Sequence, residues 1–125
     1  MKALLIFAAC FVAAVCQGRT IHSVSEVLKE ADAGLRGKVE VVGTYDFHSE
    51  EDTLRDRDDG PMLQLVLLPL LKDVPIGERY EARKKLGEKF HGQRVVILGE
   101  LTKGRLEGWS RDVIYVSVSK LEKEG

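Results

Sequence analysis

The stretch Gly37-Lys38-Val39-Glu40-Val41-Val42-Gly43-Thr44 decides how this chain folds, because its apolar and polar residues alternate. The alternation continues to residue 48 and predicts one long strand with a buried face and a solvent face. Gly43, in the middle of the stretch, suits a kink or a bulge in a strongly bent strand. The residues that we expect on the buried face are Val39, Val41, Gly43, Tyr45 and Phe47.

A second stretch, Gly92-Gln93-Arg94-Val95-Val96-Ile97-Leu98-Gly99-Glu100-Leu101, has a similar layout. Both stretches place a glycine and a basic residue before a valine-rich run, and both then reach a central glycine. We interpret them as similar solutions to entering and bending a strand, rather than as a true repeat. The second stretch predicts a strand over 93–102.

Periodic patterns predict the other elements. A helix is expected over 23–33, because Ser23 and Glu26 fit a capping box, Gly34 fits a C-cap, and five apolar residues share one face (Val24, Val27, Leu28, Ala31 and Leu35). Two strands are expected over 53–57 and 62–68, around a turn at 58–61. A second helix over 76–90 should turn Ile76, Tyr80, Leu86 and Phe90 toward the core. A last strand over 112–119 and a frayed, charged tail over 120–125 complete the chain.

The order strand-strand-strand-helix-strand-strand predicts a mainly β fold, namely a five-stranded OB-type barrel with an extra N-terminal helix. The stretches 37–44 and 92–101 resemble the first and fourth strands of OB-fold domains. The chain as a whole resembles small exported bacterial OB-like domains of unknown function, in which a signal peptide and a short helix precede the barrel. This resemblance implies a fold and a compartment but no activity. The alternating pattern would also suit other small β-barrels, which remain an alternative.

The N-terminus predicts a secretory signal peptide over 1–18. Lys2 gives a positive start, and an apolar run of 13 residues over 3–15 is too short for a membrane span, which needs roughly 20. A lipid anchor on Cys16 is the alternative, although Val15 is bulky for the position before an acylated cysteine. The expected location is therefore periplasmic or secreted.

The remaining part, 19–125, has the size of one domain with an ordinary core. Both cysteines, Cys10 and Cys16, lie in the predicted signal peptide, so no disulfide is expected to stabilise that domain. The formal net charge of the whole chain is −1, which gives no general attraction to nucleic acid or to anionic membranes.

Catalytic and metal-binding motifs are not found in the sequence, and we expect neither an enzyme nor a cofactor. The acidic stretch over 50–59 is followed by a glycine at position 60, but its acidic residues do not alternate as a calcium loop requires. No two of His22, His48 and His91 have the spacing of metal ligands, and His91 is expected to cap carbonyl groups. A calcium-dependent hydrolase would need Asp46, Glu50, Arg55 and Arg94 in nuclease-like roles, and remains a third alternative.

The sequence favours a binding or interaction module. In an OB-type barrel, ligands bind across the second and third strands, between the loops that follow the first and fourth strands. Here one of these loops is acidic and the other is basic, which suits a protein partner or a small polar ligand. Single-stranded nucleic acid or an oligosaccharide is the alternative. The candidate ligand-binding residues are Trp109, Arg105, Arg111, Lys103, His48 and Glu50.

Overall fold

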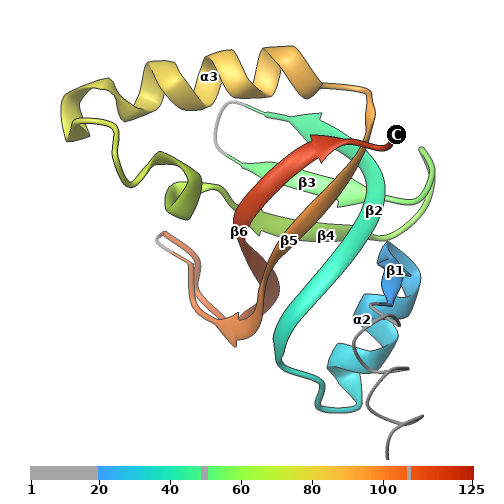
Figure 1. Ribbon diagram of the computed structural model, residues 1–125. Helices are drawn as coiled ribbons and strands as arrows, with labels where there is room; N and C mark the ends of the chain where they lie inside the picture. The colour runs from blue at the N-terminus through green and yellow to red at the C-terminus, as the bar shows by residue number, and fades with distance from the viewer. Residues whose placement is uncertain (1–19, 49–50, 107) are drawn as a thin grey trace, which may run out of the picture.

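The computed structural model describes residues 20–48, 51–106 and 108–125. Six strands, two α-helices and two short 3-10 helices make up this part of the chain (Figure 1). The predicted signal peptide and Glu50 lie outside the described residues. In chain order the elements are β1 (Ile21–Ser23), α2 (Val24–Asp32), β2 (Gly37–Phe47), β3 (Asp52–Arg55), β4 (Met62–Val66), η1 (Leu68–Leu71), η2 (Ile76–Glu78), α3 (Arg79–Phe90), β5 (Arg94–Gly104) and β6 (Val113–Lys123).

The fold is mainly β, and its sheet closes on itself. The strand order is β1-β2-β3-β4-β6-β5, and β2 also pairs with β5. The pairs β2–β3, β3–β4, β5–β6 and β2–β5 are antiparallel, whereas β4 and β6 run parallel. Closure depends on the length of β2, whose first eight residues pair with β5 and whose last four pair with β3.

Gly43 and Gly99, the central glycines of the two similar stretches, lie where a neighbouring strand approaches the backbone closely. A Cβ on Gly43 would lie 2.8 Å from Leu54 Cγ and 2.9 Å from the carbonyl oxygen of Arg55. A Cβ on Gly99 would lie 2.2 Å from the carbonyl oxygen of Ser117, and the register of β5 against β6 shifts between Leu98 and Gly99. Both positions therefore need glycine for close approach of a neighbouring strand, and the second adds an irregularity that bends the pair.

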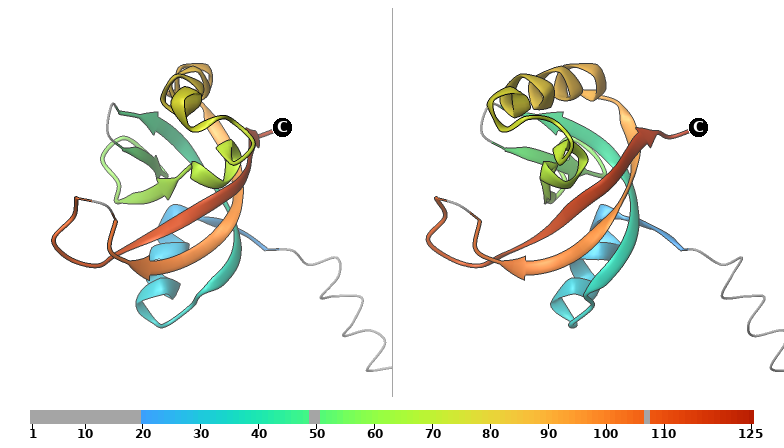
Figure 2. Two further views of the ribbon diagram at one scale, coloured as in Figure 1. Left: turned by 90° about the vertical axis from the view of Figure 1, so that its left-hand side faces the viewer. Right: turned by 60° about the vertical axis from the view of Figure 1, so that its left-hand side comes forward.

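One hydrophobic core fills the closed sheet. Tyr45, Leu54, Leu63 and Ile97 are among its fully buried side chains. The buried face predicted for β2 is confirmed, with Phe47 partly exposed at its end. Figures 1 and 2 show α3 across one end of the sheet and α2 at the opposite end.

The first predicted helix is confirmed as α2. Ser23 is its N-cap and forms the expected capping box with Glu26, and Gly34 has a φ of 106° just beyond the C-cap. The helix buries Val24, Val27 and Ala31 against the core. An additional contact was not predicted: the Asp56 carboxylate accepts hydrogen bonds from the backbone N–H groups of Val24 (2.8 Å) and Ser25 (3.0 Å).

Two features of the second half differ from the prediction. Ile76 and Tyr80 do not point into the core; they are 81% and 60% exposed, because α3 begins only at Arg79 and a 3-10 turn after Pro75 changes the helical phase. The tail over 120–125 is not frayed throughout, since β6 continues to Lys123 and pairs with 95–98 of β5. Leu121 in this extension packs against the core.

Candidate functional site

The main candidate site is a groove of about 440 Å³ on the β3–β4 face of the sheet, which we call the β3–β4 groove. Its floor is apolar and comes from β4 and the chain that follows it, with Leu65, Leu67 and Leu71. Its two ends are Glu51, in the loop between β2 and β3, and Leu106 and Trp109 in the loop between β5 and β6. Figures 1 and 2 show that the β5–β6 loop extends beyond the sheet, and Leu106 and Trp109 of this loop line the groove.

Exposed apolar side chains gather along the mouth of this groove. Trp109 is 37% exposed, and Tyr80 and Leu68 are more than half exposed. Exposed large apolar groups that share one depression indicate a contact surface more strongly than scattered ones do. Aromatic rings are also the side chains that most often anchor a partner, because they offer a large apolar area with little rotamer entropy to lose.

The wall behind the groove is a buried polar network. The Tyr45 hydroxyl donates a hydrogen bond of 2.5 Å to the Asp52 carboxylate. Arg83 Nε lies 2.8 Å from the other oxygen of Asp52, and Arg83 also donates to the carbonyl oxygen of His48 (2.7 Å). The guanidinium group of Arg83 stacks over the Phe47 ring at 4.9 Å. The network thus connects α3 to β2 and β3.

The partners of Asp52 in this network compensate the cost of burying its carboxylate. Asp52 is 4% exposed, and such a carboxylate would be costly without the adjacent cation and the hydroxyl donor. Burial of Tyr45 and its hydrogen bond to Asp52 raise the pKa of the tyrosine well above its usual range. The hydroxyl therefore remains protonated and continues to donate to Asp52. These contacts fix the position of α3, and with it Tyr80, beside the groove.

The groove also carries charges that could meet a ligand. Arg79 lines it and donates hydrogen bonds to the backbone carbonyl oxygens of Val74 (2.8 Å) and Lys72 (3.2 Å). Glu51 also lines it, and Gln64 contributes an amide from β4. The groove therefore presents both signs of charge around an apolar floor.

The structure brings only part of the predicted site together. Trp109 lines the groove, whereas His48 lies outside its lining and accepts a hydrogen bond from Arg83 through its backbone carbonyl. Arg105 lies on the solvent side of the β5–β6 loop and faces Asp112 at 4.0 Å. Lys103 and Arg111 are exposed and do not belong to the described lining of the groove.

Sequence reasoning missed Arg79, Tyr80 and Arg83 as residues of this site. All three come from the first turns of α3. The helical pattern predicted that Tyr80 faces the core and that the two arginines face solvent. A signal was present in the sequence, namely the Pro75-Ile76-Gly77 segment that delays the helix by one turn.

The acidic stretch is largely structural. Asp46 forms an ion pair of 2.6 Å with Arg55, and Asp59 pairs with Arg57 at 3.3 Å. Asp56 binds the first turn of α2; although burial opposes this, hydrogen bonds from Ser25 and Val24 hold its pKa below the usual value. Within the described ranges, no three histidine, cysteine or acidic side chains gather in a way that could hold a metal ion.

The histidines take part in local contacts. His22 Nδ1 lies 3.1 Å from a carboxylate oxygen of Glu30. The prediction that His91 caps carbonyl groups is wrong, because its Nδ1 accepts a hydrogen bond of 2.9 Å from the Phe47 N–H. The physical reason is that the end of β2 lies beside the end of α3, where an N–H of β2 needs an acceptor.

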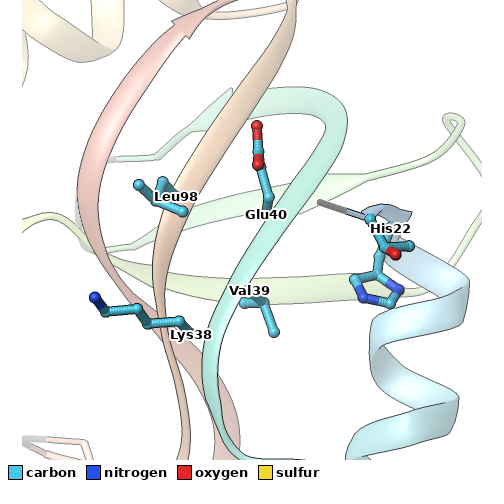
Figure 3. Close-up of a pocket in the computed structure, with 6 residues that line it drawn as sticks. His22, Lys38, Val39, Glu40 and Leu98 are labelled. Atoms are coloured by element: carbon cyan, nitrogen blue, oxygen red, sulfur yellow. The ribbon is translucent and has the colours of Figure 1, made fainter. Parts of the chain in front are cut away.

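A second depression of similar volume lies on the opposite side of β2, beside β1 (Figure 3). Lys38, Glu40 and His22 line it, but their charged or polar ends are spread apart rather than gathered about one point. This arrangement gives less basis for ligand recognition than the β3–β4 groove does.

Two further findings bear on function. No helix of the described residues is long and apolar enough to cross a membrane. No protein-family model matches this chain, and comparison with curated proteins gives no match.

Proposed function

We propose that the closed sheet is an OB-type barrel and that the chain is an exported, non-enzymatic binding module. The strand order β2-β3-β4-β6-β5, closed by the β2–β5 pair, supports the barrel, as does the parallel pair β4–β6. The position of α3 between β4 and β5 in the chain is also that of the OB helix. Export is proposed from the sequence over 1–18 alone.

The observation that carries the binding proposal is the position of the β3–β4 groove. OB-type barrels bind ligands on the second and third strands, flanked by the loops after the first and fourth strands. β3 and β4 are these strands here, and both loops contribute residues to the groove. The two exposed rings, Trp109 and Tyr80, supply the apolar contact area that a ligand would cover.

The charges favour a protein partner or a small polar ligand. Glu51 and Arg79 lie in one groove, so a uniformly anionic ligand would meet repulsion at one end. A ligand with groups of both signs, or a peptide segment with apolar side chains, would match the floor and both ends. The proposed ligand contacts are therefore Trp109, Tyr80, Arg79 and Glu51.

The test is a titration that follows the fluorescence of Trp109, the only tryptophan of the chain. The probes are short zwitterionic peptides, soluble cell-wall fragments, single-stranded DNA and calcium. We expect one class to shift the emission. In calorimetry, Trp109→Ala should then bind that probe about 30-fold more weakly, which corresponds to ~2 kcal/mol. The fold, measured by far-UV circular dichroism, should not change.

Ile76→Ala is the matched control, because Ile76 is 81% exposed and lies outside the groove lining. Its binding should equal that of the unchanged protein. Equal binding by the Trp109→Ala variant, or loss of its fold, would contradict the proposed role of this residue.

One alternative has its own support. The rings of Trp109 and Tyr80 lie in the same groove, and aromatic rings also stack on sugars and bases. Oligosaccharide or single-stranded nucleic acid is therefore the second candidate ligand. The salt dependence of the affinity distinguishes nucleic acid from oligosaccharide. Binding of a polyanion weakens steeply as the salt concentration rises, and binding of a neutral glycan does not.

A further inference from the structure

A third groove, which shares Leu71 with the β3–β4 groove, lies between α3, η1 and the end of β6; we call it the lysine groove. It has a volume of about 440 Å³ and is open to solvent. In Figures 1 and 2, α3 crosses one end of the sheet with the end of β6 beneath it. The lining residues are Leu70, Leu71, Ala82, Lys85, Leu86, Lys89 and Leu121.

The floor of the lysine groove is made of leucines that the fold leaves incompletely covered. Leu70, Leu86 and Leu121 pack against the core but remain partly exposed, whereas Leu71 is buried. They come from three separate elements, and the contribution of Leu121 depends on the extension of β6 to Lys123. The apolar surface is therefore a product of tertiary structure and is held rigidly in place.

Two cations border this floor. Lys85 and Lys89 are exposed and lie one helical turn apart on α3, so their stems leave the helix on the same side. The Lys89 ammonium group lies 5.3 Å from the centre of the Phe90 ring. Among the residues that the structure describes, neither lysine forms an ion pair with a carboxylate. Within the described part of the chain, the positive charge beside the leucines is thus not neutralised by an ion pair.

We propose that the lysine groove binds an acidic amphipathic helix of a protein partner. Apolar side chains on one face of such a helix would fill the space between Leu86 and Leu121. Carboxylates spaced by four residues on the same helix would lie beside Lys85 and Lys89, which have that spacing. Charge complementarity therefore fixes both the sign of the partner and its register.

The shape of the surface favours a helix over an anionic membrane. The leucines lie at the bottom of a groove, partly buried, and not on a convex ridge. A flat lipid surface would contact the lysines without reaching this floor, whereas a row of side chains on a helix enters a groove. A protein helix uses both the charge and the apolar area.

The test uses two cross-linked helical peptides of matched length. The acidic peptide carries leucines at positions i, i+3, i+4 and i+7 with glutamates beside them, and the basic peptide has lysine in place of each glutamate. Binding to the full chain is measured by calorimetry and mapped by NMR. We expect the acidic peptide to bind at least tenfold more tightly and to shift the signals of Leu86 and Leu121.

Reversal of the two rim charges gives the sharpest result. The double variant Lys85→Glu, Lys89→Glu should lose at least tenfold in affinity for the acidic peptide and gain affinity for the basic one. Lys84→Glu is the matched control, since Lys84 is exposed on the same helix but lies outside the lining. The Lys84→Glu variant should change the affinity for either peptide by no more than about twofold, the effect of one surface charge outside the groove.

The proposal would be overturned by equal affinity for both peptides, by no binding of the acidic peptide at millimolar concentration, or by signal shifts confined to the β3–β4 groove. Vesicles containing anionic lipid form a separate arm. Binding to these vesicles with no binding of the acidic peptide would assign the lysines to a membrane and would also overturn it. Retained binding in Trp109→Ala would show that the two grooves act independently.

Discussion

At the scale of single residues, Gly87 shows how a tertiary contact reverses what local propensity indicates. It lies in the last turns of α3, where glycine costs about 1 kcal/mol relative to alanine. A Cβ at this position, however, would lie 2.1 Å from Cδ1 of the Phe47 ring. The missing side chain lets α3 lie directly on the end of β2. Glycine is thus required here for contact between two elements.

Gly87→Ala should therefore destabilise the protein, although helix propensity alone predicts the opposite. We expect the free energy of unfolding to fall by about 1–3 kcal/mol, the usual cost of overpacking, measured by urea denaturation. Gly77→Ala is the control, because nothing lies within 4 Å of its added Cβ; it should change the stability by less than about 0.5 kcal/mol. A more stable Gly87→Ala variant would show that Phe47 moves away without cost.

At the scale of elements, the end of β6 is the clearest departure from a sequence-based expectation. Residues 120–123 are rich in charge, which predicts a solvated tail, yet they pair with 95–98 of β5. The apolar residue among them, Leu121, packs on the core. Pairing partners far away in the sequence decide whether a charged segment is a strand, and no local pattern contains that information.

The strand pairing predicts slow hydrogen exchange near the C-terminus. The amides of residues 120–123 that point toward β5 should be protected to the same degree as those in the middle of β5, because breaking them requires opening of the closed sheet. Gly125, beyond the strand, should exchange as an unstructured residue and serves as the control. Rapid exchange over the whole of 120–125 would contradict the pairing.

The elements that the sequence predicted correctly are those whose signals are local. The capping box of Ser23 and Glu26 defines the start of α2, and apolar–polar alternation, with Val42 as the exception, defines β2. The start of α3 was predicted too early, because its apolar periodicity included Ile76, which precedes the helix. That shift also explains why the groove contacts of Tyr80 were not foreseen.

The same distinction applies to the candidate site. Trp109 could be chosen from the sequence, since a single tryptophan in a loop beside a proposed binding face stands out. The pairing of Asp52 with Arg83 could not, because 31 residues separate them and Asp52 lay in an acidic run that suggested solvent exposure. Contacts of this kind depend on how α3 crosses the sheet.

At the scale of the whole molecule, one polar network joins the parts that surround the β3–β4 groove. Tyr45 belongs to β2, Asp52 to β3 and Arg83 to α3, and all three meet at the Asp52 carboxylate. Tyr45 is fully buried, so its hydroxyl has no access to solvent unless the fold opens. Ionisation of this single side chain is therefore coupled to global unfolding.

The coupling predicts that stability falls at alkaline pH. Because the pKa of Tyr45 is raised in the folded state, above pH 10 the unfolded chain releases a proton that the folded protein retains. The stabilisation is complete below pH 10 and is lost as pH rises toward the folded pKa. For one such proton, the free energy of unfolding should decrease by about 1.4 kcal/mol between pH 9 and pH 11.

Tyr45→Phe isolates this effect from other alkaline titrations. Loss of the hydrogen bond to Asp52 should lower the stability of the variant by about 1 kcal/mol at neutral pH. Its urea midpoint should then fall less steeply above pH 10 than that of the unchanged protein, so the two curves converge. Parallel curves would mean that the hydroxyl is not held protonated by the fold. Convergence would identify the wall of the β3–β4 groove as a part of the core that must stay closed for the protein to remain folded.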